Sequence, residues 1–115
     1  PTLSIDASVR PSDLTERLAE QLGYFEPSGY GNPSPVFLWR GAEVSEKRAV
    51  GKNGAHLKLK VLGEKGGRMD AIGFWLGDRL AQLPVDVDLA FAFESNEWQG
   101  RERRQLNLKD VRAVA

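Results

Sequence analysis

The sequence has no cysteine, and it has only one histidine and one methionine. Without cysteine the chain has no disulfide, no thiol nucleophile and no thiolate metal site, so a reducing compartment is expected. No apolar run approaches the roughly 20 residues that a membrane-spanning helix needs, and no signal peptide opens the chain. We therefore expect a cytoplasmic protein without a membrane partner. Motifs such as G-x-S-x-G or a P-loop are also missing, so the sequence shows no active site of these kinds.

The chain has 115 residues and equal numbers of basic and acidic side chains, which indicates a single globular domain with no net charge. It begins with Pro1 rather than methionine, so we expect a piece of a longer protein. The charges are segregated along the chain. Residues 47–68 carry seven basic side chains and one acid, residues 69–100 six acids and one base, and residues 101–112 five basic side chains and two acids. The two basic blocks either form one cationic face or belong to ordinary solvated faces.

A leucine at every fourth position from Leu14 to Leu22 predicts an amphipathic helix over Pro11–Gly23. Ser12 and Asp13 are equally good caps for its first turn.

A connector rich in turn residues follows this helix. Residues 24–35 include three prolines and two glycines, which exclude regular structure. Before the helix, the alternation of residues 3–7 predicts a short strand or an extended arm. We assign residues 1–35 to an N-terminal helix with its connector, and residues 36–115 to the main domain.

From Val36 onward apolar residues recur at every second position, which indicates β-strands. The expected strands cover residues 36–50, with a bulge near Gly41, and residues 56–61, 69–75, 85–94 and 103–111. Asn53 followed by Gly54 predicts a hairpin turn after the first strand. Residues 76–83 predict a two-turn helix that Pro84 ends. Residues 96–100 predict a loop between the last two strands.

The alternation places Leu57, Leu59 and Val61 on one face of the second strand, and Lys58 and Lys60 on the other. A barrel needs such an alternation, because one face fills its interior and the other meets solvent. Five strands with a helix between the third and the fourth are typical of the OB-fold, a partly open Greek-key barrel. We therefore predict a mainly β, five-stranded OB-fold over residues 36–115. An SH3-like barrel or an unrelated mixed domain is the alternative.

An OB-fold binds oligonucleotides on its second and third strands and on two flanking loops, and both basic blocks fall on these segments. A single strand of nucleic acid is held by cations that contact its phosphates and by aromatic rings that stack on its bases. The candidate phosphate contacts are Lys52, Lys58, Lys60, Arg101 and Arg103.

Trp98, at the tip of the expected hairpin, and Tyr30 are the candidate stacking rings. Trp39 and Trp75 either serve the same purpose or pack beneath the N-terminal helix, because tryptophan is mostly buried. His56 is the only histidine and lacks partners for a zinc site. We predict that it hydrogen-bonds to a phosphate or to the backbone.

Several stretches of the sequence carry motifs. They are F-E-P-S-G-Y-G-N-P-S-P-V-F at residues 25–37, V-G-K-N-G-A-H-L-K-L at 50–59, D-A-I-G-F at 70–74, N-E-W-Q-G at 96–100 and Q-L-N-L-K-D at 105–110. In this order, and over nearly the whole chain, they resemble the RecJ family of single-stranded-DNA-specific exonucleases.

The resemblance implies an OB domain that accompanies the catalytic domains of a nuclease. Family members digest single-stranded DNA from the 5′ end in DNA repair and recombination, with Mn²⁺ or Mg²⁺ held by an Asp-His-His motif and other ligands. This sequence has no such motif, so we expect neither a catalytic residue nor a cofactor in this piece. We predict a single-stranded-DNA-binding OB domain of a RecJ-like hydrolase, with DNA and the parent's catalytic domains as partners. The alternative is a protein-interaction module that docks a repair partner or the catalytic core.

Overall fold

The structure is a computed structural model that describes residues 3–15, 17, 18, 35–63 and 66–115, with the backbone alone at 95–98, 102 and 103. Its strands are β1 (Ala7–Ser8), β2 (Phe37–Val50), β3 (His56–Leu62), β4 (Arg68–Gly73), β5 (Asp86–Trp98) and β6 (Arg101–Ala113). Within these ranges the short 3-10 helices are η1 (Pro11–Asp13), η2 (Lys52–Gly54) and η4 (Gly77–Gln82). No helix of the described residues is long and apolar enough to cross a membrane.

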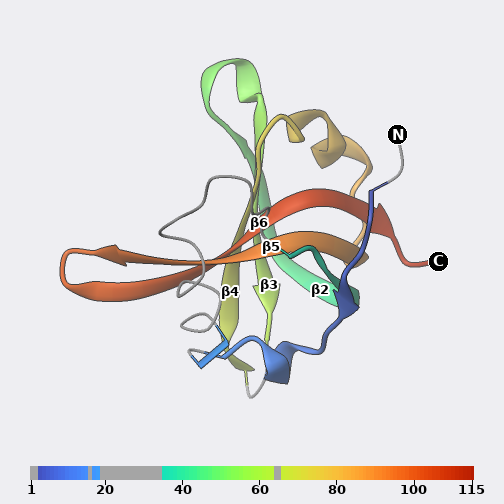
Figure 1. The fold of residues 1–115 in the computed structure, drawn as a ribbon. Coiled ribbons are helices and arrows are strands. Elements are labelled where there is room, and N and C mark those ends of the chain that lie inside the picture. The colour runs from blue at the N-terminus through green and yellow to red at the C-terminus, as the bar shows by residue number, and fades with distance from the viewer. Residues whose placement is uncertain (1–2, 16, 19–34, 64–65) are drawn as a thin grey trace.

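The strands form one sheet in the order β1-β2-β3-β4-β6-β5, and a further pairing of β2 with β5 closes β2–β6 into a barrel (Figure 1). β4 and β6 run parallel, whereas β2–β3, β3–β4, β5–β6 and β2–β5 are antiparallel pairs. The short β1 pairs in parallel with the start of β2. This closed five-stranded barrel confirms the mainly β OB-fold predicted from the sequence, in place of an SH3-like barrel or an unrelated mixed domain.

The barrel interior is filled by the apolar residues that alternate along its strands. Leu57, Leu59 and Val61 of β3 are at most 1% exposed, as the alternation predicts. The other strands add buried side chains, among them Phe37, Trp39, Ala71, Leu89, Phe91, Leu106 and Leu108. Each large apolar side chain buried in this way stabilises the fold by roughly 1.5–3 kcal/mol. Trp39 is therefore a core residue and not a stacking platform.

A glycine bulge bends β2 between its two neighbours in the barrel. The register with β5 shifts between Trp39 and Ala42, and Gly41 there has a φ of 71°, which favours glycine. The N–H of Gly41 donates to Asp88 Oδ1 over 2.9 Å. The bulge predicted near Gly41 is thus confirmed. Because bulges bend strands, this one lets β2 pair first with β5 and then with β3, which closes the barrel.

The segment after β4 differs in detail from the prediction. β4 ends at Gly73, so Phe74 and Trp75 lie in a turn and not in a strand. The helix predicted over residues 76–83 is the 3-10 helix η4. Its first N–H, on Gly77, donates to the Ala55 carbonyl over 3.0 Å and so ties η4 to the turn between β2 and β3.

β5 and β6 extend through the residues predicted as a loop. β5 continues to Trp98, which pairs with Arg101 across a turn formed by Gln99 and Gly100 alone. Both turn residues have positive φ values, 50° and 75°, as a type I′ hairpin turn requires. The two strands therefore form a long hairpin that projects from the barrel (Figure 1).

The helix predicted over Pro11–Gly23 is described only in part. Its beginning is the 3-10 helix η1, where Asp13 Oδ2 accepts the N–H of Arg10 over 2.8 Å. After η1 the Thr15 hydroxyl accepts the N–H of Leu18 over 3.1 Å, so Thr15 takes the capping position before the helical residues 17 and 18. Leu14 is 3% exposed and Leu18 packs against the core, so these two leucines face the barrel. Residues 19–34, with the rest of the helix and most of the connector, lie outside the described residues.

Candidate nucleic-acid interface

OB-folds bind oligonucleotides on the face of their second and third barrel strands, here β3 and β4, with β2 beside them. His56, Lys58 and Lys60 alternate with the buried leucines of β3 and therefore project away from the interior. With about 3.3 Å per residue, these three side chains span about 13 Å along the strand. We use "outer face" below for these three residues and their cross-strand neighbours.

Arg48 of β2 lies directly opposite Lys58, so two cations are cross-strand neighbours. Like charges in this position are destabilising by themselves. On its other side Lys58 faces the apolar Ile72 of β4. Within the part of the chain that the structure describes, neither cation forms an ion pair. The Arg48–Lys58 pair is thus an uncompensated cationic spot that suits a phosphate, and the sequence-based candidates did not include Arg48.

Lys60 has acidic neighbours on both sides. Its cross-strand partners are Glu46 of β2 and Asp70 of β4, and its Nζ lies 4.0 Å from Asp70 Oδ1. Its charge is therefore partly compensated within the sheet. We conclude that Lys60 attracts a phosphate less strongly than Lys58, although the two lysines look equivalent in the sequence.

Three rings gather at one end of the outer face, beside the turn between β2 and β3. Trp75 is 76% exposed and Phe74 52% exposed. The His56 ring lies edge-on to both, with centroids 4.6 Å from Trp75 and 5.3 Å from Phe74. Trp75 is therefore neither in a strand nor packed under the N-terminal helix.

His56 is oriented by the chain around it. Its Nδ1 accepts the backbone N–H of Trp75 over 3.0 Å, so in the neutral ring the proton lies on Nε2. A Cβ on Gly51 would lie 2.7 Å from the His56 Cδ2, so the ring occupies space that only glycine leaves free. Lys52, which follows Gly51 in the sequence, is exposed on the turn between β2 and β3. His56 and Lys58, two of the candidates predicted from the sequence, therefore share the outer face, and Lys52, a third, lies in the adjoining turn.

The remaining candidates lie elsewhere. Arg101 is exposed at the tip of the β5–β6 hairpin, which projects in a different direction from the turn between β2 and β3 (Figure 1). Trp98 and Arg103 lie on the same hairpin by their backbone pairing, and their side chains are outside the described part of the structure. Tyr30 falls among residues 19–34, also outside it.

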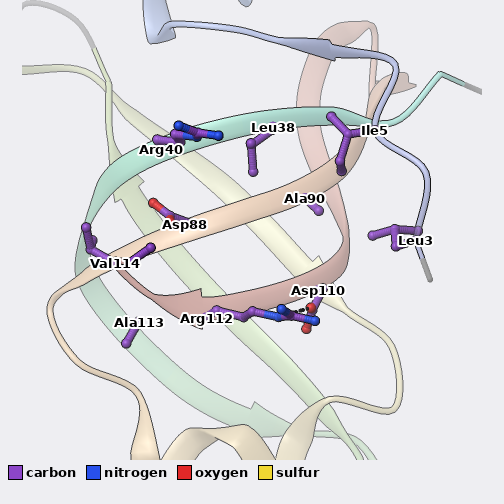
Figure 2. A pocket seen from close by; sticks show the side chains of 11 residues that line it. Leu3, Ile5, Leu38, Arg40, Asp88, Ala90, Asp110, Arg112, Ala113 and Val114 are labelled. Atoms are coloured by element: carbon purple, nitrogen blue, oxygen red, sulfur yellow. Dashed lines mark hydrogen bonds and ion pairs between the residues drawn. The ribbon is translucent and has the colours of Figure 1, made fainter. Parts of the chain in front are cut away.

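A pocket of about 580 Å³ lies on a different side of the barrel, between β2, β5, β6 and the segments that lead into β1 and out of β6 (Figure 2). Leu3, Ile5 and Val114 line it and are 42%, 40% and 47% exposed. None of its lining residues belongs to β3 or β4. The pocket is therefore distinct from the outer face.

An ion-pair cluster at the edge of this pocket joins η4 to the end of β6. Arg79 Nη1 donates to Asp110 Oδ1 over 3.0 Å and to the Val111 carbonyl over 2.8 Å, and Arg112 Nε donates to Asp110 Oδ2 over 2.7 Å. Burial alone would raise the pKa of Asp110, but the hydrogen bonds from Arg112 and Arg79 outweigh it and lower that pKa below 3.8. The cluster is a structural element that favours the ionised carboxylate.

The resemblance implies a divalent metal in the parent, but the described residues contain no set of side chains that fits one. Nowhere among them do three His, Cys, Asp or Glu side chains gather as a metal site would require. We assign no metal-dependent step to this domain.

Known proteins resemble this chain over most of its length. Residues 5–110 match the family described as the RecJ OB domain. Two proteins named single-stranded-DNA-specific exonuclease RecJ are similar: the one from Bacillus subtilis is 27% identical over 113 residues, and the one from Thermus thermophilus is 35% identical over 99 residues. These alignments cover 96% and 86% of this chain but 14% of each relative, so the chain spans a small part of their length.

Solved structures are also similar to this chain. A crystal structure of RecJ from Thermus thermophilus in complex with Mn²⁺ superposes with a TM-score of 0.71 and 28% identity, and the match covers 98% of this chain and 16% of that one. A second crystal structure shows the same protein in complex with Mg²⁺. It superposes with a TM-score of 0.65 and 31% identity, and the match covers 93% of this chain and 16% of that one. The barrel topology and the match over residues 5–110 lead to one conclusion: this chain belongs to the RecJ OB domain family.

Proposed function

We propose that this chain is the single-stranded-DNA-binding OB domain of a RecJ-like exonuclease, and that the outer face of β2–β4 holds the strand. The observation that carries the proposal is the Arg48–Lys58 pair, two cations placed opposite each other on the face that OB-folds use. Their mutual repulsion disfavours the free domain. A bound phosphate relieves that repulsion, and its condensed counterions are released to solvent.

The proposed contacts extend beyond this pair. They comprise Lys52, His56, Lys58 and Lys60 with Arg48 on or beside the outer face, Trp98, Arg101 and Arg103 on the β5–β6 hairpin, and Tyr30 on the connector. Trp98 and Tyr30 would supply rings, and the arginines would supply charge.

The rest of the proposal concerns the parent protein. The chain covers 14% of relatives named single-stranded-DNA-specific exonuclease, so the catalytic domains would be formed by other parts of the parent. The parent would digest single-stranded DNA in the 5′→3′ direction with Mn²⁺ or Mg²⁺, in DNA repair and recombination in the cytoplasm. This domain would add affinity for the strand and no nuclease activity of its own.

Fluorescence anisotropy of a labelled single-stranded oligonucleotide, titrated with the chain at several salt concentrations, tests the binding. We expect weak binding with little sequence preference that falls steadily as salt rises. The double variant Arg48→Ala with Lys58→Ala should weaken it strongly. Lys109→Ala, which removes an exposed cation from β6, is the matched control and should have little effect. Binding that does not depend on salt, or none at millimolar protein, contradicts the proposal.

The pocket supports a second candidate function, docking of another protein. Leu3, Ile5 and Val114 expose apolar surface there, and such surface favours a protein contact more than a nucleic acid. The partner would be the catalytic core of the same parent or a repair protein. Ile5→Asp should abolish sedimentation of this chain with the parent's catalytic part while leaving the affinity for DNA unchanged. Unchanged co-sedimentation would rule out the pocket as the docking site.

A further inference from the structure

Trp75 is the most exposed of the large apolar residues in the described structure, and it does not stand alone. It is 76% exposed, and with Phe74 and His56 it forms a continuous group of rings at the end of the outer face. Single exposed apolar residues are ordinary, but a cluster of exposed rings marks a binding surface. A ligand that covers this group would therefore be one that stacks on aromatic faces.

The backbone holds Trp75 in a conformation that tryptophan rarely adopts. Its φ is 65°, in the left-handed region that glycine prefers. Such outliers persist only where the surrounding structure enforces them, and they gather at functional sites. Here the enforcing contact is visible: the Trp75 N–H donates to His56 Nδ1 over 3.0 Å, and the two rings meet edge to face with centroids 4.6 Å apart.

His56 is itself held in place. Its ring fills the space beside Gly51, where a Cβ would come within 2.7 Å of it. Gly51 leaves room for His56, and His56 holds Trp75. The backbone of Trp75 is therefore held by His56 and its exposed indole packs against the same ring, so the Trp75 side chain loses less conformational freedom when a ligand stacks on it.

Cations lie on the same surface. Lys58 follows His56 by two residues on the same face of β3, and its neighbour across the sheet on β4 is Ile72. Lys52 is exposed on the turn next to Gly51. A ring beside a row of cations is the arrangement that holds single-stranded nucleic acid, with bases on the ring and phosphates on the charges.

We propose that Trp75 is a stacking platform for one nucleobase of the bound strand, and that His56 is the positioning residue that holds it there. This inference rests on the proposed function, since it names the ligand group that the outer face accepts at one end. It assigns stacking to Trp75, for which the sequence left both stacking and packing open.

The test compares two fluorescently labelled ligands of equal length and charge: an oligothymidylate and an abasic oligomer with the same phosphates. The wild-type chain should bind the oligothymidylate more tightly, because only this ligand has bases that stack on the rings. Trp75→Ala should lower that ratio by about 5- to 150-fold, the contribution of one stacked base, and leave the affinity for the abasic oligomer unchanged. Trp75→Phe should retain part of the ratio. Val85→Ala, a change at another exposed apolar residue, should leave it intact.

The positioning role of His56 has its own readout. His56→Ala should lower the ratio in the wild-type background but not in the Trp75→Ala background, because its effect on stacking acts through Trp75. His56→Asn, whose amide oxygen can accept the Trp75 N–H, should restore part of the ratio. Equal losses from His56→Ala in both backgrounds would show that His56 does not act through Trp75.

The outcomes separate the two proposals. If Trp75→Ala leaves the ratio unchanged while binding remains salt-dependent, the platform is elsewhere and the proposed function stands. If the wild-type chain binds neither oligomer, the proposed function itself fails and this inference fails with it.

Discussion

Gly77 packs directly against Gly54, so that η4 and the turn between β2 and β3 meet without side chains between them. A Cβ on Gly77 would lie 1.8 Å from the Gly54 carbonyl oxygen, closer than any real contact allows. Gly77→Ala should therefore destabilise the fold by about 2–3 kcal/mol through forced backbone movement. Urea unfolding followed by circular dichroism measures this. Gly66→Ala, where nothing lies within 4 Å, is the control and should cost about 1 kcal/mol for its positive φ.

Core truncations should be costly in proportion to burial. Leu59, Phe91 and Leu106 are at most 1% exposed, so each changed to alanine should lose roughly 2–5 kcal/mol from the free energy of unfolding. Lys58→Ala, one residue from Leu59 but on the outer face, should cost well under about 1 kcal/mol. Thermal melts of the four variants provide the comparison. A Lys58→Ala melt as low as those of the apolar variants would show that the register of β3 is wrong.

Arg48 and Lys58 should each account for about one phosphate contact. Removing either should flatten the plot of log affinity against log salt by about 0.7, the value for one phosphate of a single strand. All oligonucleotide sequences should be weakened alike, because phosphates carry no sequence information. Lys60→Ala should flatten the plot less, since Glu46 and Asp70 already compensate that charge. Equal effects of Lys58→Ala and Lys60→Ala would argue against this compensation.

Removing the acid beside Lys60 should strengthen DNA binding. Asp70→Asn keeps the shape of the side chain but frees Lys60, whose Nζ lies 4.0 Å from Asp70 Oδ1. We expect the affinity for single-stranded DNA to rise about two- to fivefold at low salt and the gain to shrink at high salt. Asp86→Asn removes the same charge at the start of β5 and should have no such effect. Anisotropy titrations of both variants with labelled single-stranded DNA, at low and at high salt, measure these affinities.

The Asp110 cluster predicts a loss of stability in acid. A pKa lowered by folding means that the ionised carboxylate stabilises the native state above the unfolded value near 3.8, and that this contribution disappears as pH falls below it. Asp110→Asn should therefore cost about 1 kcal/mol at neutral pH and progressively less below about pH 4. The free energies of unfolding of the wild-type chain and of Asp110→Asn, measured at pH 7 and at pH 2.5, test whether the difference between them shrinks in acid. A difference that grows in acid would contradict it.

Much of the barrel could be predicted because local signals agreed with the fold. The alternation of Leu57, Leu59 and Val61 is visible in the sequence. Gly41, which takes a positive φ at the β2 bulge, indicates in the sequence where that bulge lies. The β5–β6 hairpin was predicted with too long a loop. Asn96 and Gly100 resemble loop residues, but the type I′ turn needs only Gln99 and Gly100, which leaves the residues before them free to pair.

The site was harder to predict, because its features depend on contacts between distant parts of the chain. Trp75 continues the sequence pattern of β4, whereas its positive φ and its hydrogen bond to His56, which is 19 residues away in the sequence, show that the strand has already ended. The position of Arg48 opposite Lys58 depends on the length of the turn between β2 and β3. A slip of one residue there would send Arg48 to the other face.

The parallel pairing of β4 with β6 has a consequence for synthesis of the chain. Among the strands of this barrel β6 is the last in chain order, yet it lies between β4 and β5 in the sheet. A chain on the ribosome that has not yet reached Arg101 therefore exposes unpaired edges on both of those strands. The barrel closes only after Gln105–Asn107 of β6 have paired with β4, so a truncation before Gln105 should leave an open sheet prone to aggregation.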